Sequence, residues 1–196
     1  MKFSKLQIKA LVSQFYPQLK NECLQQFLDI CRYESYENKE IILSPGRLDH
    51  RVFIILEGSA RAYSIDHNGD EVNSHMRSKG FLFGDPRVFG EQPCLLTIEA
   101  ITPIHVLIFN INTLEKLGFE NPNLMRFYID LMKEVIVTFS RRIDSFVTKT
   151  SKQRYLDLID WNPEYLNLAY DKHLASFIGI KPLTLHRIKK ELGHIK

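Results

Sequence analysis

The sequence contains little cysteine and no long apolar run. Cys23, Cys31 and Cys94 are the three cysteines among 196 residues, and their odd number and wide spacing fit neither a disulfide framework nor a CxxC metal site. An iron–sulfur cluster needs about four thiolate ligands, more than one chain supplies. No apolar run of about 18 residues is present, so no transmembrane helix is expected. Residues 1–20 lack the apolar core of a secretion signal. The sequence therefore predicts a cytoplasmic protein with reduced thiols.

Common enzyme motifs are also missing. The chain has no Gly-rich P-loop, no Gly-x-Ser-x-Gly elbow and no His-Glu-x-x-His sequence. His50, His67 and His75 occur in a β-rich region with Glu57 and Glu71, so a cupin-like metalloenzyme is one alternative. However, no His-x-His pair places two imidazoles on one face of a strand. Haem ligation by a single histidine leaves no sequence signature and stays open. We expect a protein that is not an enzyme and has no metal site.

Charge is nearly balanced overall but unevenly distributed. The formal net charge is +3, from 26 Lys and Arg against 23 Asp and Glu. Residues 171–196 carry six cations and two anions, a net charge of +4, which leaves about −1 for residues 1–170. A neutral body followed by a basic segment is typical of a sensing module joined to a phosphate-binding module.

The C-terminal 25 residues predict two short helices joined at Gly179. One apolar set precedes the glycine and another follows it at helical spacing: Leu174, Ala175 and Ile178, then Leu185, Ile188 and Leu192. This pattern indicates a helix-turn-helix. The second helix carries polar and cationic side chains that can contact DNA phosphates and base edges in a major groove: Lys181, Thr184, His186, Arg187, Lys189 and Lys190. A basic amphipathic helix without a DNA role is the alternative.

Different roles are expected along that second helix. Lys181 and Thr184 lie near its start and suit phosphate contacts, which the helix dipole favours. Arg187 is the first choice for a base-edge contact, because its planar fork can bond guanine O6 and N7 together. His186 is a second candidate for base readout.

The middle of the chain, residues 39–110, is rich in short strand-like runs separated by turn signals. The expected strands are residues 41–43, 52–56, 60–65, 71–76, 95–101 and 105–109. Asn68-Gly69 between two of these runs is the strongest hairpin signal. Many short strands at regular spacing favour a double-sheet β jelly roll over an α/β sheet. Residues 4–15 and 21–31, which precede it, have helical apolar spacing.

Residues 122–150 predict one long helix, about 40 Å if unbroken. Asn121 can cap it, and Pro122 suits its first turn. Its apolar stripe has the three- and four-residue steps of a helix that pairs with another helix: Leu124, Tyr128, Leu131, Val135, Phe139 and Ile143. We interpret the stripe as a dimer interface. The alternative is packing against the chain's own barrel.

Five parts of the sequence are informative together with this order of elements: 46-GRLDHRVFIILEGSARAY-63, Gly80, 83-FGD-85, 98-IEA-100 and 173-HLASFIGIKPLTLHRIKKEL-192. In their order and spacing they closely resemble the Crp/Fnr family of transcription regulators. The resemblance implies an α+β architecture: an N-terminal cyclic-nucleotide-binding-like jelly roll, a long dimerisation helix and a small C-terminal winged helix-turn-helix-like domain. It also implies a homodimer that binds double-stranded DNA at a two-fold-related site.

The resemblance suggests three parts to the chain. They are an effector domain at residues 1–120, a dimerisation helix at 121–150 and a DNA-binding domain at 151–196. Pro182 and Leu183 stand where an Arg-Glu pair often begins base readout in the family, so the DNA site need not match that of better-known members.

The effector pocket is expected at Gly84, Asp85, Arg87, Cys94 and Leu95. Cyclic-nucleotide binders of this fold hold the phosphate with backbone N–H groups and an Arg, and hold the ribose with a Glu. Asp85 is the shorter acceptor at the Glu position, and Cys94 and Leu95 fall at the Arg and small-residue positions, in a loop one residue shorter. Neither side chain can neutralise a phosphate, so we expect no cyclic AMP binding. Another small-molecule effector, or none, is left open, as is an effector-binding protein without sequence-specific DNA binding.

Overall fold

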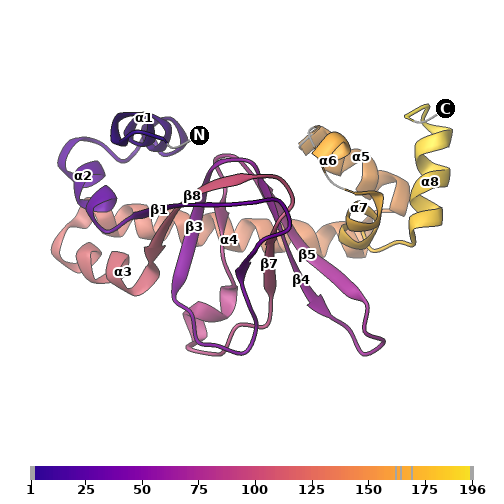
Figure 1. Ribbon diagram of the computed structural model, residues 1–196, viewed down its shortest axis with the longest axis horizontal. Helices are drawn as coiled ribbons and strands as arrows, with labels where there is room; N and C mark the ends of the chain where they lie inside the picture. The colour runs from indigo at the N-terminus through magenta and orange to yellow at the C-terminus, as the bar shows by residue number, and fades with distance from the viewer. Residues whose placement is uncertain (1–2, 162, 164, 169, 195–196) are drawn as a thin grey trace. The chain divides into compact units, whose positions relative to one another are not determined.

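Two antiparallel four-stranded sheets form the β-rich part of the chain, in the strand orders β1-β8-β3-β6 and β2-β7-β4-β5. The computed structural model describes residues 3–161, 163, 165–168 and 170–194 (Figure 1). The strands are β1 (Arg32–Tyr36), β2 (Ile41–Leu43), β3 (Arg51–Glu57), β4 (Ser59–Ile65), β5 (Glu71–Ser78), β6 (Leu82–Phe83), β7 (Thr97–Ala100) and β8 (Ile104–Asn110). The predicted jelly roll is confirmed.

Helices precede and follow these sheets. They are α1 (Lys5–Phe15), α2 (Asn21–Asp29), α3 (Ile111–Glu120), α4 (Pro122–Thr148), α5 (Ser151–Trp161), α6 (Tyr165–Leu168), α7 (Asp171–Phe177) and α8 (Pro182–Glu191), with a short 3-10 helix η1 at Pro86–Gly90. The predicted long helix is confirmed as α4. Within the described residues, no helix has both the length and the apolar composition needed to cross a membrane.

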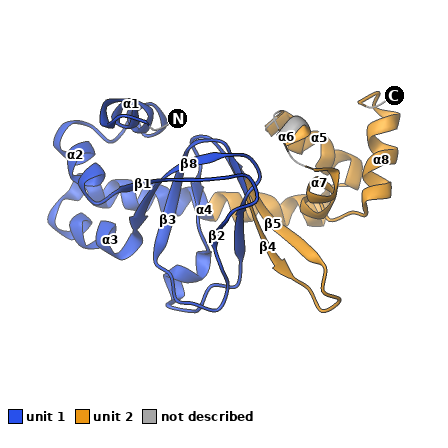
Figure 2. Cartoon of the chain, viewed as in Figure 1, with its two compact units in different colours: residues 1–60, 77–135 blue, residues 61–76, 136–196 orange. Residues whose placement is uncertain are grey.

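The chain divides into two compact units (Figure 2). Unit 1 comprises residues 1–60 and 77–135, and unit 2 comprises residues 61–76 and 136–196. The tip of the β4–β5 hairpin therefore belongs to the same unit as the C-terminal helices. The three-part division expected from the sequence stays a prediction.

The Asn68-Gly69 signal marks a real hairpin. β4 and β5 are neighbours in their sheet, and the amide of Asp66 donates to the carbonyl of Asp70 at 2.9 Å across the turn. Gly69 has a φ of +85°, a conformation that glycine adopts without a steric penalty.

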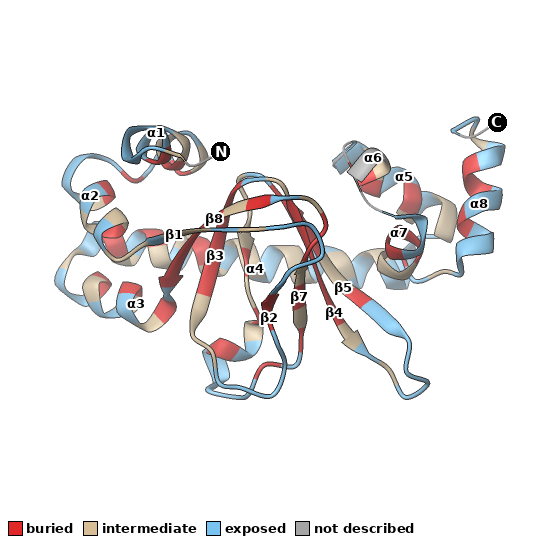
Figure 3. Ribbon diagram, viewed as in Figure 1, coloured by how far each residue is buried: buried red, intermediate tan, exposed pale blue. Residues whose placement is uncertain are grey.

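A core of unit 1 lies where strands β3 and β8 of one sheet pack against helices α1, α2, α3 and α4, and Figure 3 shows the buried residues in red. Helix α4 contributes Leu124, Phe127 and Leu131, all at most 1% exposed, to this core. Leu124 and Leu131 were predicted to lie in a dimer interface. They are instead buried against the chain's own core, because the N-terminal half of α4 turns this face inward. Tyr128 and Val135 are partly buried, and Ile143 is exposed.

Candidate nucleic-acid interface and effector pocket

The turn between α7 and α8 depends on Gly179. Its φ is +69°, and the amide of Ile180 donates to the carbonyl of Ala175 at 2.9 Å, which closes the end of α7. A Cβ atom at this position would lie 2.5 Å from Cε1 of Phe146. Glycine is therefore required both by the backbone conformation and by the close approach of α4. The predicted helix-turn-helix is confirmed.

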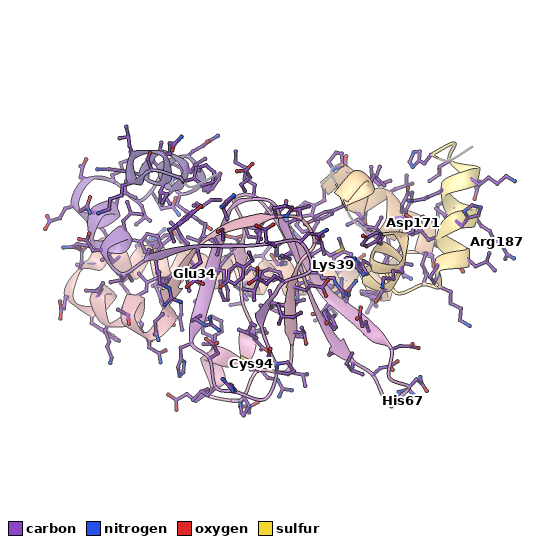
Figure 4. The ribbon with its side chains drawn as sticks, viewed as in Figure 1. Glu34, Lys39, His67, Cys94, Asp171 and Arg187 are labelled. Carbon is purple, nitrogen blue, oxygen red and sulfur yellow. The ribbon has the colours of Figure 1, made fainter. Side chains whose placement is uncertain are left out.

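Helix α8 has one buried and one exposed face. Leu174 and Ala175 of α7 and Leu185 of α8 have no exposed surface, and Ile188 is also buried. The remaining face exposes the polar and cationic residues Thr184, His186, Arg187 and Lys190, with Lys181 exposed at the N-cap. Pro182, Leu183 and Glu191 are exposed on the helix as well. Figure 4 shows Arg187 on this helix. These five of the six predicted DNA contacts lie on one accessible surface, which we call the α8 surface.

Lys189, the sixth predicted DNA contact, does not lie on the α8 surface. It is 6% exposed, and its Nζ forms an ion pair with the carboxylate of Asp171 on α7. The reason is helical spacing, since position 189 lies four residues after Leu185 and so falls on the same buried face. The Lys189–Asp171 pair joins α8 to α7, and we leave Lys189 out of the α8 surface.

The predicted effector pocket is organised by Asp85. Its carboxylate accepts hydrogen bonds from the backbone amides of Arg87 at 2.9 Å, Leu95 at 2.7 Å and Leu96 at 2.9 Å. Asp85 is 2% exposed. An Asp-Pro pair at the start of η1 is a local signal for the first of these bonds, because Asp is a favoured N-cap residue. The bonds to Leu95 and Leu96 have no such signal.

The other predicted pocket residues provide no buried cation. Arg87, the one cation of the five, has an exposed side chain, and Leu95 is exposed too. Cys94 is buried, and its backbone exchanges hydrogen bonds with Arg47 and Gly46. Burial raises the pKa of the Cys94 thiol, and the Asp85 carboxylate raises it further. Cys94 therefore stays a neutral thiol at physiological pH.

Histidines in the β region are scattered. His67 is exposed on the hairpin tip (Figure 4), while the ring of His75 packs edge-on against Phe139 with centroids 5.0 Å apart. Within the part of the chain that the structure describes, no three His, Cys, Asp or Glu side chains are grouped so that they could hold a metal ion.

Comparisons with known proteins agree with this architecture. Residues 33–121 match the family model for the cyclic nucleotide-binding domain. No curated protein matches the chain. FixK2 from Bradyrhizobium japonicum has a similar structure, with a TM-score of 0.72, 18% identity and coverage of 84% of this chain and 85% of that one.

Two further solved structures are similar. A CooA mutant from Carboxydothermus hydrogenoformans has a TM-score of 0.67 and 16% identity, covering 91% of this chain and 83% of that one. A transcriptional regulator of the CRP/FNR family from Thermus thermophilus, TTHA1359, has a TM-score of 0.62 and 19% identity, covering 83% of this chain and 86% of that one. The expected resemblance is confirmed at the level of the fold: residues 33–121 match the cyclic nucleotide-binding domain model, and the chain has the fold of the Crp/Fnr family transcription regulators.

Proposed function

We propose that this protein is a homodimeric DNA-binding transcription regulator that inserts α8 of each subunit into a major groove. The observation that carries the proposal is the α8 surface, a cationic face that lies opposite the buried apolar face of the second helix in a helix-turn-helix. This is the face that such proteins present to base edges. The fold shared with transcription regulators supports the same conclusion.

Binding to a random DNA pool tests the proposal. The purified protein is incubated with the pool at two salt concentrations, with and without cyclic AMP, and the retained DNA is sequenced. We expect a palindromic consensus whose binding weakens steeply with salt, because Lys and Arg contacts release counterions from phosphates. The absence of any enriched sequence would refute sequence-specific DNA binding and favour an effector-binding protein without it.

Arg187→Ala should weaken binding in a position-specific way. The guanidinium of Arg187 is exposed on α8, and a bidentate contact to guanine is worth roughly 1 to 3 kcal/mol. We expect that loss at one base pair of each half-site, measured by repeating the selection with the variant. Lys116→Ala, which removes an exposed cation on α3, serves as the control and should leave the consensus unchanged. Uniform weakening at all positions would instead assign Arg187 to the phosphates.

The dimer interface is best placed on the exposed face of α4. Ile129, Ile136 and Ile143 are 41%, 67% and 62% exposed, and each lies seven residues from the next. Residues seven apart occupy the same heptad position, one of the two apolar positions that form the seam of paired helices, and leaving such large side chains in water is unfavourable. We therefore propose that this isoleucine stripe, rather than Leu124 and Leu131, contacts the second subunit.

Ile136→Glu is expected to convert the dimer into a monomer. The variant places a negative charge at the middle of the isoleucine stripe, next to the same charge on the partner helix, in a desolvated interface. Sedimentation equilibrium measures the molecular mass. Val137→Glu is the matched control, because Val137 is also exposed but lies about 100° further round the helix. A dimer in both variants would exclude the stripe as the interface.

We also propose that cyclic AMP is not the effector. A cyclic phosphate would need the backbone amides near the start of β7, yet those of Leu95 and Leu96 already donate to Asp85. A phosphate there would also face the buried Asp85 carboxylate, and Arg87, the one arginine among the five predicted pocket residues, is exposed. Calorimetric titration with cyclic AMP should therefore show no binding, and saturable heat would contradict this part of the proposal. Another effector, or none, is compatible with the same pocket.

A further inference from the structure

Strand β5 is the edge of its sheet, and helices of unit 2 satisfy its outer backbone groups. β5 is last in the order β2-β7-β4-β5, and an edge strand presents backbone groups that have no strand partner. The amide of Asn73 donates to Oγ of Ser176 at 2.8 Å, and the same hydroxyl donates to the carbonyl of Glu71 at 3.1 Å. Ser176 lies on α7, so the first helix of the helix-turn-helix is hydrogen-bonded to the hairpin.

Arg142 of α4 also contacts strand β5 and helix α7. Its Nη2 donates to the carbonyl of Asn73 and to the carbonyl of Phe177, each at 3.1 Å. The Phe177 carbonyl is at the C-terminal end of α7, where helix carbonyls lack partners within the helix. The guanidinium also lies over the rings of Phe177 and Phe146, 4.4 Å and 4.9 Å from their centroids. One side chain thus connects β5, α4 and α7.

Buried polar side chains form a second layer of this contact. Arg61 and Asn73 are 3% and 1% exposed. Nη1 of Arg61 donates to the Glu71 carboxylate at 2.6 Å and to Oδ1 of Asn73 at 3.2 Å. Nδ2 of Asn73 in turn donates to the backbone carbonyl of His173 on α7, at 2.9 Å. Glu71 is exposed, but Arg61 and Asn73 are buried and bonded to each other, and a buried bonded pair of this kind favours one arrangement of the segments that it joins.

We propose that this contact, the hairpin dock formed by Glu71, Asn73, Arg142 and Ser176, is a positioning device for DNA recognition. It fixes the helix-turn-helix to the β4–β5 hairpin through α7 and leaves the α8 surface exposed. A dimer that reads two half-sites must hold its recognition helices one DNA turn apart, about 34 Å. A helix-turn-helix attached only by a flexible tether would lose conformational freedom on binding, which weakens affinity. This proposal rests on the proposed function.

Amide exchange tests the dock without DNA. In the full-length protein, we expect Ser176→Ala to speed hydrogen exchange at the Asn73 amide by roughly fivefold or more, since a hydrogen bond contributes about 1 kcal/mol. Ser74→Ala is the matched control: its hydroxyl donates to the Ala62 carbonyl at 3.2 Å, within the hairpin, and the variant should leave this amide unchanged. Equal exchange in wild type and Ser176→Ala would overturn the dock.

Half-site spacing tests the positioning role. Two DNA duplexes are compared: the selected palindrome, and the same palindrome with one base pair inserted at its centre. The affinity of each duplex is measured for wild type, Ser176→Ala and Arg142→Lys. The lysine of the last variant keeps the positive charge but cannot span two carbonyls in the same way. We expect wild type to prefer the native spacing strongly, and the ratio of the two affinities to fall severalfold in both variants, with the base preferences of each half-site kept.

The outcomes separate the two proposals. An equal loss of affinity at both spacings would indicate a merely destabilised domain and overturn the positioning role. If wild type enriches no sequence, the proposed regulatory function fails, while the exchange measurement still decides whether the dock exists.

Discussion

Asp85→Ala is expected to lower the free energy of unfolding by about 3 to 5 kcal/mol. The Asp85 carboxylate accepts three backbone N–H bonds and is 2% exposed. Hydrogen bonds to a charged group contribute more than neutral ones, and each buried N–H left without a partner carries a desolvation penalty. Denaturant unfolding of wild type and variant measures the difference.

Asp66→Ala is the matched control for that measurement. Its carboxylate also accepts two backbone amides in a turn, those of Asn68 and Asp70, but these bonds are exposed, so water can replace them. A loss in Asp66→Ala as large as that in Asp85→Ala would show that burial does not make the Asp85 contacts special.

A small carboxylate should partly rescue Asp85→Ala. Removing the side chain leaves the amides of Leu95 and Leu96 facing a space that formate or acetate can occupy, and binding to the folded state raises stability by mass action. We expect formate to raise the unfolding midpoint of Asp85→Ala more than that of wild type or Asp66→Ala. An identical shift in all three proteins would argue against the idea that the Asp85 carboxylate occupies a place where a small anion can bind.

Acidification should destabilise the protein through His173. This side chain on α7 is 4% exposed, and within the described structure neither ring nitrogen has a hydrogen-bond partner. Burial lowers the pKa of His173 to about 4, helped by the positive charges of Arg61 and Lys172 and opposed by Glu71. The unfolded chain takes up the proton near its ordinary pKa of 6.5 and the folded chain does so only near 4.

The free energy of unfolding should therefore fall as the pH drops from about 6.5 to about 4. The full loss is about 3 kcal/mol, from 1.36 kcal/mol per pKa unit. Denaturant unfolding at a series of pH values measures it. His173→Phe should flatten this part of the profile and retain stability at pH 7, because no partnered nitrogen is lost. The exposed His67→Gln is the control. An unchanged slope in His173→Phe would assign the acid sensitivity to other groups.

Local signals predicted much of the fold. Gly179, the Asn68-Gly69 turn and the apolar spacing of α4 each correspond to the expected element. Strand β1 was not predicted, because it has no fully buried residue and so lacks an apolar alternation. Helix α3 was missed as well, although its N-cap was readable, since the Asn110 side chain accepts from the amides of Asn112 and Thr113.

The candidate site was only partly predictable for a different reason. Five of the six expected DNA contacts are exposed on α8, as a helical pattern can indicate. The residues of the hairpin dock had no sequence signal, because Asn73 and Ser176 are about 100 positions apart and act largely through backbone groups. A contact between such distant positions leaves no periodic pattern in the sequence.

The sequence by itself determined the order of modules, the hairpin, the helix-turn-helix and its cationic surface, because turn residues and apolar spacing act over a few neighbouring positions. Only the tertiary structure decided which face of α4 is buried, that Lys189 pairs with Asp171, and that Asp85 holds the amides of Leu95 and Leu96. Each of these depends on which separate segments meet in space, and burial then determines whether a charge is solvated, paired or hydrogen-bonded.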